Sequence, residues 1–319
     1  MSQVSAQPHA HPRRRQPRIQ VGDRLLTHLF IWPTLILLIV MNVFPLFYSL
    51  YLSFTEYSGI GDTPPDWVGI ENYEEILSNT GHPDKRDGNR YWHNFAVTGR
   101  YAVMSVGLQL VVGFSLAMLL KEKFRGNGLV TTLILIPMML APAVVGIFWK
   151  LIFDPSKGIF SYMMYTSNPR DHAWLADPEL ALWAIVIVDV WMWSPFVMLL
   201  CLAGLRAIPD YLYEAAAIDR ASAWFQFRRI TLPRVAPLLL IALLFRTIEA
   251  FKTFDLVAEL TFGNPGGDTT EVIALRLYRE AFPPQFNTGE SSAAAYIILI
   301  LVIALSNLYI RALGRLRED

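Results

Sequence analysis

Cysteine and charge are both scarce in this chain of 319 residues. The single cysteine, Cys201, lies inside an apolar run, so no disulfide and no cysteine-based metal site can form within one chain, and a buried packing thiol is expected. Only 17% of the residues are charged and 54% are hydrophobic, and the mean hydropathy is +0.36. This balance excludes an ordinary soluble domain and makes a membrane protein the first hypothesis.

The motifs of several enzyme classes are also missing. No Gly-x-x-x-x-Gly-Lys-Ser/Thr segment occurs. If ATP drives the function of this chain, a separate protein must bind and hydrolyse it. The six histidines are scattered and indicate no metal site. The formal net charge is zero, so nothing points to nucleic acid as a partner. No nucleophile with a neighbouring base stands out, and an enzyme is not expected.

Six segments are long and apolar enough to cross a membrane. A hydrocarbon core of roughly 30 Å requires about 20 helical residues. Such long runs, joined by short polar connections, leave too little polar surface for a soluble protein. We therefore expect an all-α integral membrane protein with tails at 1–25 and 312–319 and a membrane domain at 26–311. The predicted spans are 27–54, 96–120, 129–150, 180–205, 235–257 and 291–310.

The distribution of Lys and Arg predicts the orientation of these spans. Six spans place both termini on one side of the membrane, where sixteen Lys and Arg residues lie against nine on the other side. The positive-inside rule therefore predicts cytoplasmic termini. Arg13, Arg14 and Arg15 resemble the basic region of a signal peptide, but the apolar run that follows, Leu29 to Tyr48, is too long for one. We expect an uncleaved first span behind a basic tail.

Prolines occur inside the first, third and fourth predicted spans. Membrane helices tolerate them because neighbouring groups satisfy the carbonyls that lose a partner. We interpret them as kinks in preference to gating hinges. They are Pro33, Pro45, Pro137, Pro142 and Pro195.

The cytoplasmic segment 207–234 between the fourth and fifth spans has an internal order of its own. Pro209 suits the first turn of a helix that continues to Ile218. Ser222 is a candidate N-cap for a second short helix, which Pro233 is expected to end. Two helices of about ten residues are marginal alone, so they require a partner surface.

Three alanines give this segment the character of a docking element. Ala215, Ala216 and Ala217 have small side chains that let a helix seat closely in a groove, while Glu214 and Asp219 place charges at its ends. Composition alone leaves a second interpretation open, in which the segment lies at the membrane interface.

The sequence of this segment resembles a known family. Glu214–Asp219, followed by Phe227–Pro233 and Pro237, is similar to the EAA loop of binding-protein-dependent ABC sugar-import permeases of the maltose, glycerol-phosphate and polyol type. Val68–Tyr73 and Thr261–Gly266 also resemble that branch of the family, in its first type of permease subunit. The likeness covers most of the chain from about residue 29.

The resemblance implies a type I ABC importer permease fold with a cytoplasmic coupling helix. The positions carried over to ATPase coupling are Glu214, Ala215, Ala216, Asp219 and Arg220. Arg220 stands where the family usually has glycine. Glycine would permit a left-handed turn residue that arginine adopts only with strain, so either the turn differs or the docking surface gains a charge.

The resemblance also implies partners and cargo. It implies a heterodimer with a second permease subunit, two copies of an ABC ATPase that bind ATP and Mg, and a periplasmic or lipoprotein solute-binding protein. The chain itself then needs no cofactor, contacts membrane lipid, and lies as a multi-pass protein in the bacterial cytoplasmic (inner) membrane. The cargo implied is an oligosaccharide, a monosaccharide, a polyol or a derivative of these.

The fifth span carries charges of alternating sign three residues apart: Arg246, Glu249, Lys252 and Asp255. Ionisable groups at membrane depth are costly and favour a functional role. Three residues advance only about 300° around a helix, so each of these charged side chains is rotated relative to the one before it. The four side chains are therefore not expected to face one cavity. An ion-pair ladder, or pairs to the second permease subunit, is the alternative to contacts with cargo.

Candidate cargo contacts follow from the resemblance and from the charges. The resemblance maps sugar-contacting positions to Trp193, Phe196, Glu249 and Lys252. Asp189 lies alone in an apolar run and must meet a partner, either Arg246, Lys252 or a polar ligand. The full candidate set is Asp189, Trp193, Phe196, Arg246, Glu249 and Lys252. We expect Trp191 to pack against helices or lipid instead.

Two other classes of protein are the alternatives to a permease. A secondary transporter would use midplane charges without an ATPase, but it leaves the loop from Glu214 to Pro237 unexplained and the sequence shows no inverted repeat. A membrane-embedded enzyme would need clustered catalytic side chains at an aqueous boundary. The external segment 58–94 is interpreted either as a connecting loop or as a face for a binding protein.

Overall fold

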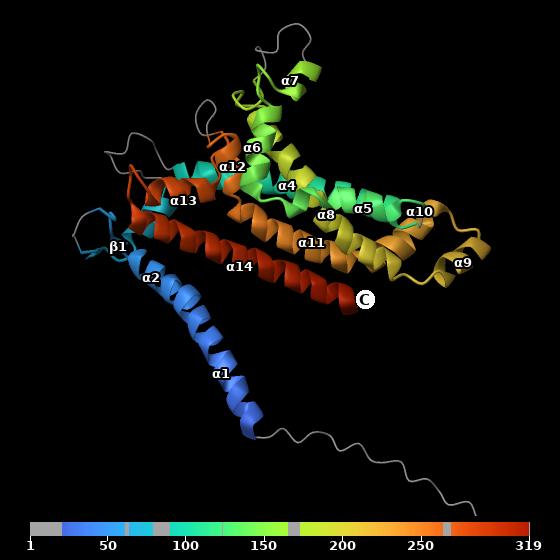
Figure 1. Cartoon of the computed structure of the whole chain (residues 1–319), viewed down its shortest axis with the longest axis horizontal. Helices are drawn as coiled ribbons and strands as arrows, with labels where there is room; N and C mark the ends of the chain where they lie inside the picture. Colours follow the sequence, from blue (N-terminus) through green and yellow to red (C-terminus); the bar gives the residue numbers. More distant parts are fainter. Residues whose placement is uncertain are drawn as a thin grey trace, which may run out of the picture. The chain divides into compact units, whose positions relative to one another are not determined.

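The computed structural model describes residues 21–60, 64–78, 90–122, 124–164, 173–263 and 269–318. The basic tail with Arg13–Arg15 and the charge run at 84–87 lie outside the described residues. Within them the chain is almost entirely helical, with one two-stranded antiparallel ribbon (Figure 1). It divides into two compact units, Met1–Tyr51 and Leu52–Asp319.

The first unit is an apolar helical segment with a local irregularity. It comprises α1 (Val21–Leu38), a π-helical turn (Ile39–Val43) and most of α2 (Phe44–Leu52). Because Pro45 has no N–H and its ring crowds the preceding turn, a locally widened helix accommodates it without a break. Pro45 therefore sits in the continuous apolar stretch His28–Leu52, which is long enough to span a membrane.

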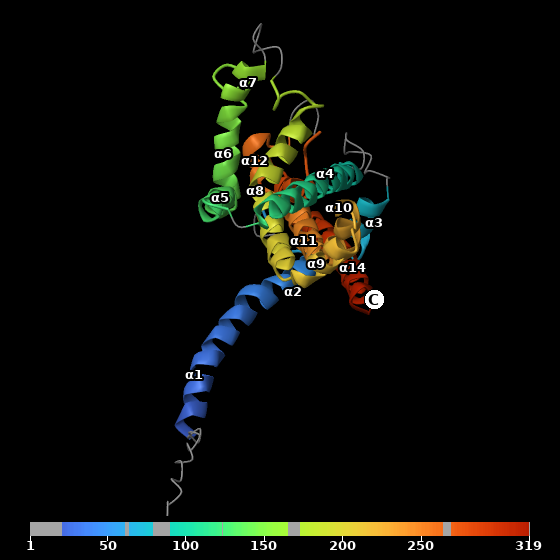
Figure 2. The same cartoon turned by 90° about the vertical axis from the view of Figure 1, so that its right-hand side faces the viewer.

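The second unit is built on four long helices. They are α4 (Arg90–Leu120), α8 (Ala181–Arg206), α11 (Leu232–Lys252) and α14 (Thr288–Glu318). Helix α4 lies along α8, while α11 contacts α4, α8 and α14 (Figures 1 and 2). Among the described residues, four helices are long and apolar enough to cross a membrane, three of them in this unit: Tyr91–Leu120, Ala181–Arg206 and Thr288–Arg315.

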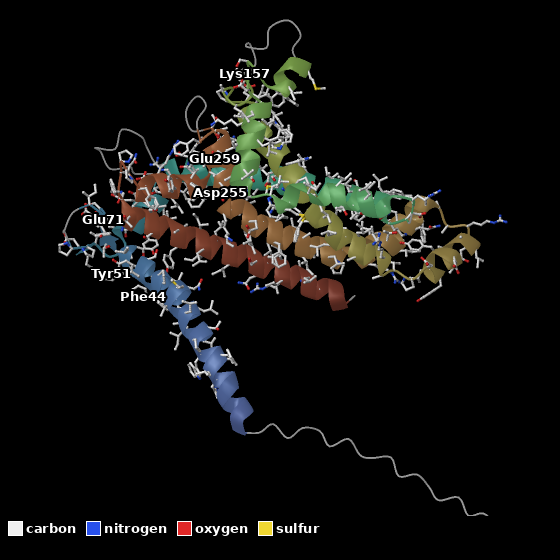
Figure 3. The ribbon with its side chains drawn as sticks, viewed as in Figure 1. Phe44, Tyr51, Glu71, Lys157, Asp255 and Glu259 are labelled. Atoms are coloured by element: carbon white, nitrogen blue, oxygen red, sulfur yellow. The ribbon has the colours of Figure 1, made fainter. Side chains whose placement is uncertain are left out.

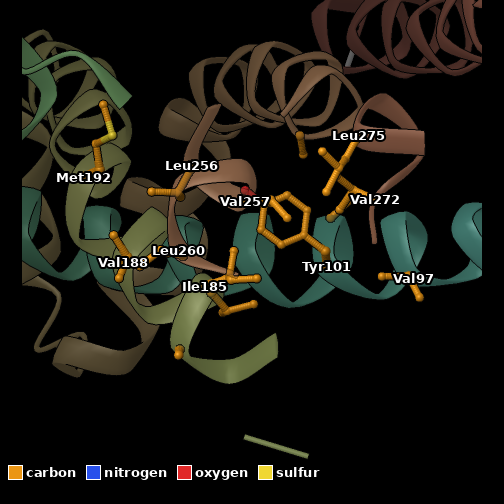
Figure 4. Packing of buried hydrophobic residues seen from close by; sticks show 14 of the residues in the cluster. Val97, Tyr101, Ile185, Val188, Met192, Leu256, Val257, Leu260, Val272 and Leu275 are labelled. Carbon is orange, nitrogen blue, oxygen red and sulfur yellow. The ribbon is translucent and has the colours of Figure 1, made fainter. Parts of the chain in front are cut away.

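The core of this unit consists of two buried clusters along α4 and α8. One surrounds Tyr101, Met192 and Val257 (Figure 4). The other, nearer the cytoplasmic ends by the predicted orientation, includes Met198 and Cys201. The Cys201 thiol is fully buried, as expected for a packing residue.

The segment predicted as the third span, 129–150, is not one helix. It forms α5 (Asn127–Leu135), a 3₁₀ turn (Pro137–Met139) and α6 (Pro142–Ile152). Helices α5 and α6 point in clearly different directions (Figures 1 and 2). The interpretation of Pro137 and Pro142 as simple kinks was wrong. Leu140 and Ala141, directly before Pro142, are extended, because proline disfavours helical geometry in the residue before it.

The segment predicted as the fifth span, 235–257, is also interrupted. Helix α11 ends at Lys252, and α12 (Asp255–Leu260) starts anew after Thr253 and Phe254 leave helical geometry. Helix α12 packs against α6. Neither the third nor the fifth segment is among the four long apolar helices of the described residues, so the expected count of six continuous spans is not confirmed.

Small elements cover the end of the unit where α4 and α14 begin. They are β1 (Thr55–Glu56), β2 (Asp66–Trp67), α3 (Glu71–Leu77) and α13 (Ile273–Ala281). A further short helix, α7 (Ile159–Met164), contacts α6 instead. Asn72 donates to the carbonyls of Ser53 and Thr55 and holds α3 against the ribbon. Of the predicted motif Thr261–Gly266, the last three residues lie outside the described part.

Helices α4 and α8 approach closely at Gly113, and this contact predicts a sharp substitution effect. A Cβ at residue 113 would lie 2.6 Å from Val197 Cβ and 2.7 Å from the Ser194 carbonyl oxygen. Overpacking of this kind costs about 1–3 kcal/mol. Gly113→Ala is therefore expected to lower the midpoint of thermal unfolding of the purified protein in detergent.

Gly107→Ala is the matched control, because it makes the same change on the same helix where nothing lies within 4 Å. It is expected to be neutral or to stabilise by up to about 1 kcal/mol through helix propensity. Equal midpoints for the two variants would contradict the close packing of α4 on α8.

Candidate functional sites: a charged cavity and a cytoplasmic loop

A small cavity of about 100 Å³ opens between α8, α11 and α12. Charged and aromatic side chains dominate its wall, and Asp255, which is labelled in Figure 3, lines it from the start of α12. The lining residues are Pro142, Asp189, Met192, Trp193, Arg246, Glu249, Lys252, Thr253, Phe254, Asp255 and Leu256.

All four charges of the fifth predicted span line this one cavity, which corrects the expectation that they would drift apart. The expectation assumed one continuous helix through Asp255. Thr253 instead has φ −59° and ψ 118°, and Phe254 has φ −128° and ψ −61°. This break redirects the chain, so Asp255 returns to the face that Arg246, Glu249 and Lys252 share.

Asp189 and Arg246 form a buried ion pair in the wall of the cavity. Arg246 Nη2 lies 3.4 Å from Asp189 Oδ1, and Arg246 and Asp189 are 1% and 2% exposed. Ser105 Oγ and Gln109 Nε2 donate to Asp189 Oδ2, the latter at 2.7 Å. Gln109 Oε1 accepts from Arg246 Nε at 2.8 Å. Of the partners considered for Asp189, the structure selects Arg246, and it adds two neutral residues from α4.

Trp193 joins this group, whereas Phe196 does not. The Arg246 guanidinium lies over the Trp193 ring at 4.5 Å, within cation–π range. Phe196, a predicted cargo contact, does not line the cavity and packs edge-on against Phe245 at 6.4 Å. Trp191 packs edge-on against Trp149 at 5.5 Å, in keeping with the packing role expected for it.

The second charge pair of the cavity is accessible. Lys252 Nζ lies 3.1 Å from Glu249 Oε1, with side chains 61% and 51% exposed. Exposed ion pairs one helical turn apart are weak. Glu249 and Lys252 can therefore separate and each bind another polar group at little cost in free energy. Asp255 is exposed and has no ion pair among the described residues.

Sequence reasoning missed the contribution of α4 to this site. Asn94, Thr98, Tyr101, Ser105 and Gln109 are all fully buried. Their spacing of four, three, four and four residues places them on one face of a helix. A polar stripe inside an otherwise apolar span was the signal that could have identified Ser105 and Gln109.

The loop predicted to be cytoplasmic, between α8 and α11, forms two helical elements as expected, beginning with α9 (Tyr211–Ile218). Glu214, Ala215 and Asp219 are exposed, Ala216 is buried, and Ile218 is 82% exposed. Tyr211, Trp224 and Phe225 of the same loop are also exposed, and several exposed apolar side chains in one segment are typical of an interface with another protein or with a membrane.

Arg220 occupies the left-handed turn that glycine would favour, with φ 53°. Its N–H bonds the Ala217 carbonyl at 3.1 Å, and the Ala221 N–H bonds the Ala216 carbonyl at 2.9 Å, which is the Schellman pattern at a helix C-terminus. The usual turn is therefore kept despite the substitution, at a cost of about 1–2 kcal/mol, and the surface gains a positive charge.

The second helix of the loop does not end at Pro233. Ser222 caps α10 (Ala223–Gln226) by accepting from the Phe225 N–H at 3.2 Å, as predicted. A π-helical turn (Phe227–Thr231) then leads directly into α11, which has Pro233 in its first turn. The π-helical turn accommodates Pro233, which has no N–H to donate, without breaking the helix. The loop is thus continuous with α11.

Comparison with known proteins agrees with this architecture. The family described as binding-protein-dependent transport system inner membrane component matches residues 109–318, more than half of the chain. The chain belongs to this family. The expected family is therefore confirmed, and the permease is a component of a transport system of the inner membrane.

Individual relatives extend the likeness over nearly the whole permease. It is 34% identical to the trehalose/maltose transport system permease protein MalF of Thermococcus litoralis, over 95% of this chain and 98% of that protein. It is 31% identical to the trehalose transport system permease protein SugA of Mycobacterium tuberculosis, over 92% and 91%.

A solved structure gives the fold. A chain of a bacterial ABC transporter involved in the import of the acidic polysaccharide alginate superposes with a TM-score of 0.76 over 92% of the permease and 96% of that chain. Their sequences are 19% identical, so the likeness concerns the fold alone. The expected class, an all-α ABC importer permease, is confirmed.

The buried pair predicts a strong and coupled effect on stability. Arg246→Met leaves the Asp189 carboxylate buried without its cation, which typically costs about 3–5 kcal/mol. The double variant Asp189→Asn with Arg246→Met removes both charges and is expected to recover most of that loss in thermal unfolding of the detergent-purified protein.

Lys252→Met is the control for this prediction. It also removes a cation from an ion pair, but the Glu249–Lys252 pair is exposed, so the loss is expected to stay below about 1 kcal/mol. A double variant as unstable as Arg246→Met alone would show that the two buried charges are not coupled.

Proposed function

We propose that the permease is the subunit of an ATP-driven, binding-protein-dependent importer that carries a sugar or sugar-like solute across the cytoplasmic membrane. The observation that supports this most is the cavity wall, where an aromatic ring and two pairs of charges meet among the helices of a membrane domain. The relatives named as trehalose/maltose and trehalose permeases support the same class of cargo.

The chemistry of the wall suits a polyhydroxyl compound. Sugars present apolar ring faces and rims of hydroxyl groups. Trp193 offers an aromatic surface, while Glu249 and Lys252 offer an acceptor and a donor whose mutual pair is exposed and weak. The opposed charges lie close together, so hydroxyl groups can bridge them without adding charge to the membrane interior.

The size of the cavity supports a second permease subunit. Ligand pockets usually measure about 300–1,000 Å³, and the cavity in this chain measures about 100 Å³. One chain therefore supplies one wall of a pathway. A second permease subunit, in a heterodimer, completes it, and a solute-binding protein delivers the cargo at the outer face.

The cytoplasmic loop supports coupling to separate ATPase subunits. Its exposed tip, with Glu214, Ile218 and Arg220, has the size and chemistry of a docking knob. The loop joins α8 to α11, and these two helices carry Asp189, Trp193 and Arg246. Displacement at the loop therefore reaches the cavity wall directly. ATP and Mg are bound by the two ATPase copies, and the chain itself needs no cofactor.

This loop and both termini lie in the cytoplasm in the proposed arrangement. The sixteen Lys and Arg residues on that side, against nine on the other, support the orientation. In this orientation α11 runs from the cytoplasmic side toward the outside. Lys252, at its outer end, lies about 9 Å beyond Arg246 at 1.5 Å per residue. The cavity, which both residues line, therefore lies toward the outer half of the membrane.

Glu214→Arg tests the coupling loop. The permease is co-purified with its candidate ATPase, second permease and binding protein, and ATP hydrolysis is measured with and without binding protein loaded with trehalose or maltose. Reversal of a charge in a docking surface typically costs several kcal/mol of binding. We expect stimulation of hydrolysis to fall at least about tenfold.

Glu122→Arg is the control, because it reverses an exposed charge at the cytoplasmic end of α4, outside the loop. It is expected to leave stimulation within about twofold of wild type. Full stimulation in Glu214→Arg would contradict the docking role of the loop. Wild-type stimulation by neither sugar would exclude trehalose and maltose as the cargo without bearing on the loop.

A further inference from the structure

Gln109 occupies the centre of the buried cluster behind the cavity. It lies on α4, and none of the residues its side chain bonds is on its own helix except Ser105. Its amide nitrogen donates to Asp189 Oδ2 at 2.7 Å and to Ser105 Oγ at 2.9 Å, and its amide oxygen accepts from Arg246 Nε at 2.8 Å. One neutral side chain thus serves the anion and the cation of the pair at once.

The distances show which contact orients the arginine. Charge-assisted hydrogen bonds are usually about 2.7–2.9 Å long. The Arg246–Asp189 contact measures 3.4 Å, whereas the Arg246–Gln109 contact measures 2.8 Å. The direct ion pair is therefore loose, and Gln109 holds the guanidinium on one edge while Trp193 holds it on its face.

Simple cohesion of the helices does not require this arrangement. Apolar residues of similar volume stabilise a buried site as well as an ion pair does, or better. Helices α4 and α8 already have a close backbone contact at Gly113. A buried amide that bonds opposite charges on two other helices stabilises the fold less than apolar packing would. Its effect is to fix the positions of the two charged side chains.

The fixed geometry faces the cavity. Asp189, Trp193 and Arg246 line it, while Ser105 and Gln109 lie behind them and do not. Arg246 Nη1 makes no hydrogen bond with the described residues, and it is not one of their buried polar atoms that lack a partner. Because Arg246 lines the cavity, this N–H group is free to donate to a ligand there.

We propose that Gln109, assisted by Ser105, is a positioning residue for transport. It holds Arg246 so that the guanidinium Nη1 and the Trp193 ring together present one defined surface to a hydroxyl-bearing cargo. This inference rests on the proposed sugar pathway, which it deepens by adding two residues of α4 that do not touch the cargo.

The test uses the complete importer in liposomes and measures labelled trehalose and maltose taken up per ATP hydrolysed. Gln109→Met keeps the length of the side chain and removes its hydrogen bonds. Loss of a charge-assisted bond at a positioning residue is expected to lower the ratio of sugar moved to ATP hydrolysed by about tenfold. A purely structural role would lower uptake and hydrolysis in parallel and leave the ratio unchanged.

A charge-relocation variant distinguishes hydrogen bonding from packing. Gln109→Glu combined with Asp189→Asn moves the carboxylate from position 189 to position 109. The relocated carboxylate can accept from Arg246, and the new amide at position 189 can donate to that carboxylate. This double variant is expected to restore the ratio to within about threefold of wild type. Gln109→Glu alone puts two carboxylates side by side and is expected to fail.

Two serines of α4 provide a matched comparison. Ser105→Ala removes a donor to Asp189, whereas Ser115→Ala removes an exposed hydroxyl that bonds only the Val111 carbonyl of its own helix. Ser105→Ala should lower the ratio several-fold and Ser115→Ala should not. If Gln109→Met is not recovered from the membrane, this comparison decides the question.

The possible outcomes test the positioning role of Gln109 separately from the proposed function in sugar import. An unchanged ratio in Gln109→Met and in Ser105→Ala, with wild type importing sugar, overturns the positioning role alone. A low ratio in Gln109→Met that the relocated carboxylate fails to restore also overturns it. A wild-type importer that takes up none of the sugars overturns the proposed function, and the inference with it.

Discussion

The membrane domain depends on one buried contact between charges that lie far apart in the sequence. Asp189 of α8 and Arg246 of α11 each carry a charge that would be prohibitive alone in an apolar interior. They are stabilised by each other and by Ser105 and Gln109 of α4. Three helices must therefore meet in a single register for any of these groups to be satisfied. The cavity is the accessible side of that meeting point.

Close packing fixes the same helices at other levels. Gly113 brings α4 against α8, and Gly204 brings α8 against α11, where an added Cβ would lie 2.5 Å from Leu238 Cδ1. Gly204 lies near the C-terminal end of α8, a few residues before the loop begins. Helices α8 and α11 are thus held together both beside the loop and beside the cavity. The loop continues into α11 without a break, because a π-helical turn carries the chain past Pro233.

The sequence was informative wherever local chemistry decides the structure. Ser222 caps a helix because its side chain meets a free N–H three residues on, and the burial of Cys201 followed from its apolar surroundings. Likewise, the long apolar helices α4, α8 and α14 could be predicted from length and composition. The family resemblance correctly indicated the class of protein, and the turn at Arg220 keeps its shape because backbone hydrogen bonds outweigh the strain of one residue.

Features that depend on distant contacts were not predictable. Gln109 meets Asp189 across 80 residues and Arg246 across 137, and no local pattern specifies such partners. The break at Thr253 and the sharp turn before Pro142 were missed because both segments have the composition of a continuous span. As a consequence, the four charges of Arg246 to Asp255 were assigned to different faces. Phe196 was placed at the cavity by resemblance, although its ring packs against Phe245.

A structure of the complete importer with a sugar bound in the membrane would test this account most directly. The measured quantities are the contacts of the sugar and the separation of Arg246 from Asp189 and Gln109. The account predicts a sugar against Trp193, Arg246, Glu249 and Lys252, with Arg246 Nε still bonded to Gln109 behind them. A sugar bound elsewhere in the pathway, or an Arg246 side chain turned away from Asp189 and Gln109 in the occupied state, would contradict it.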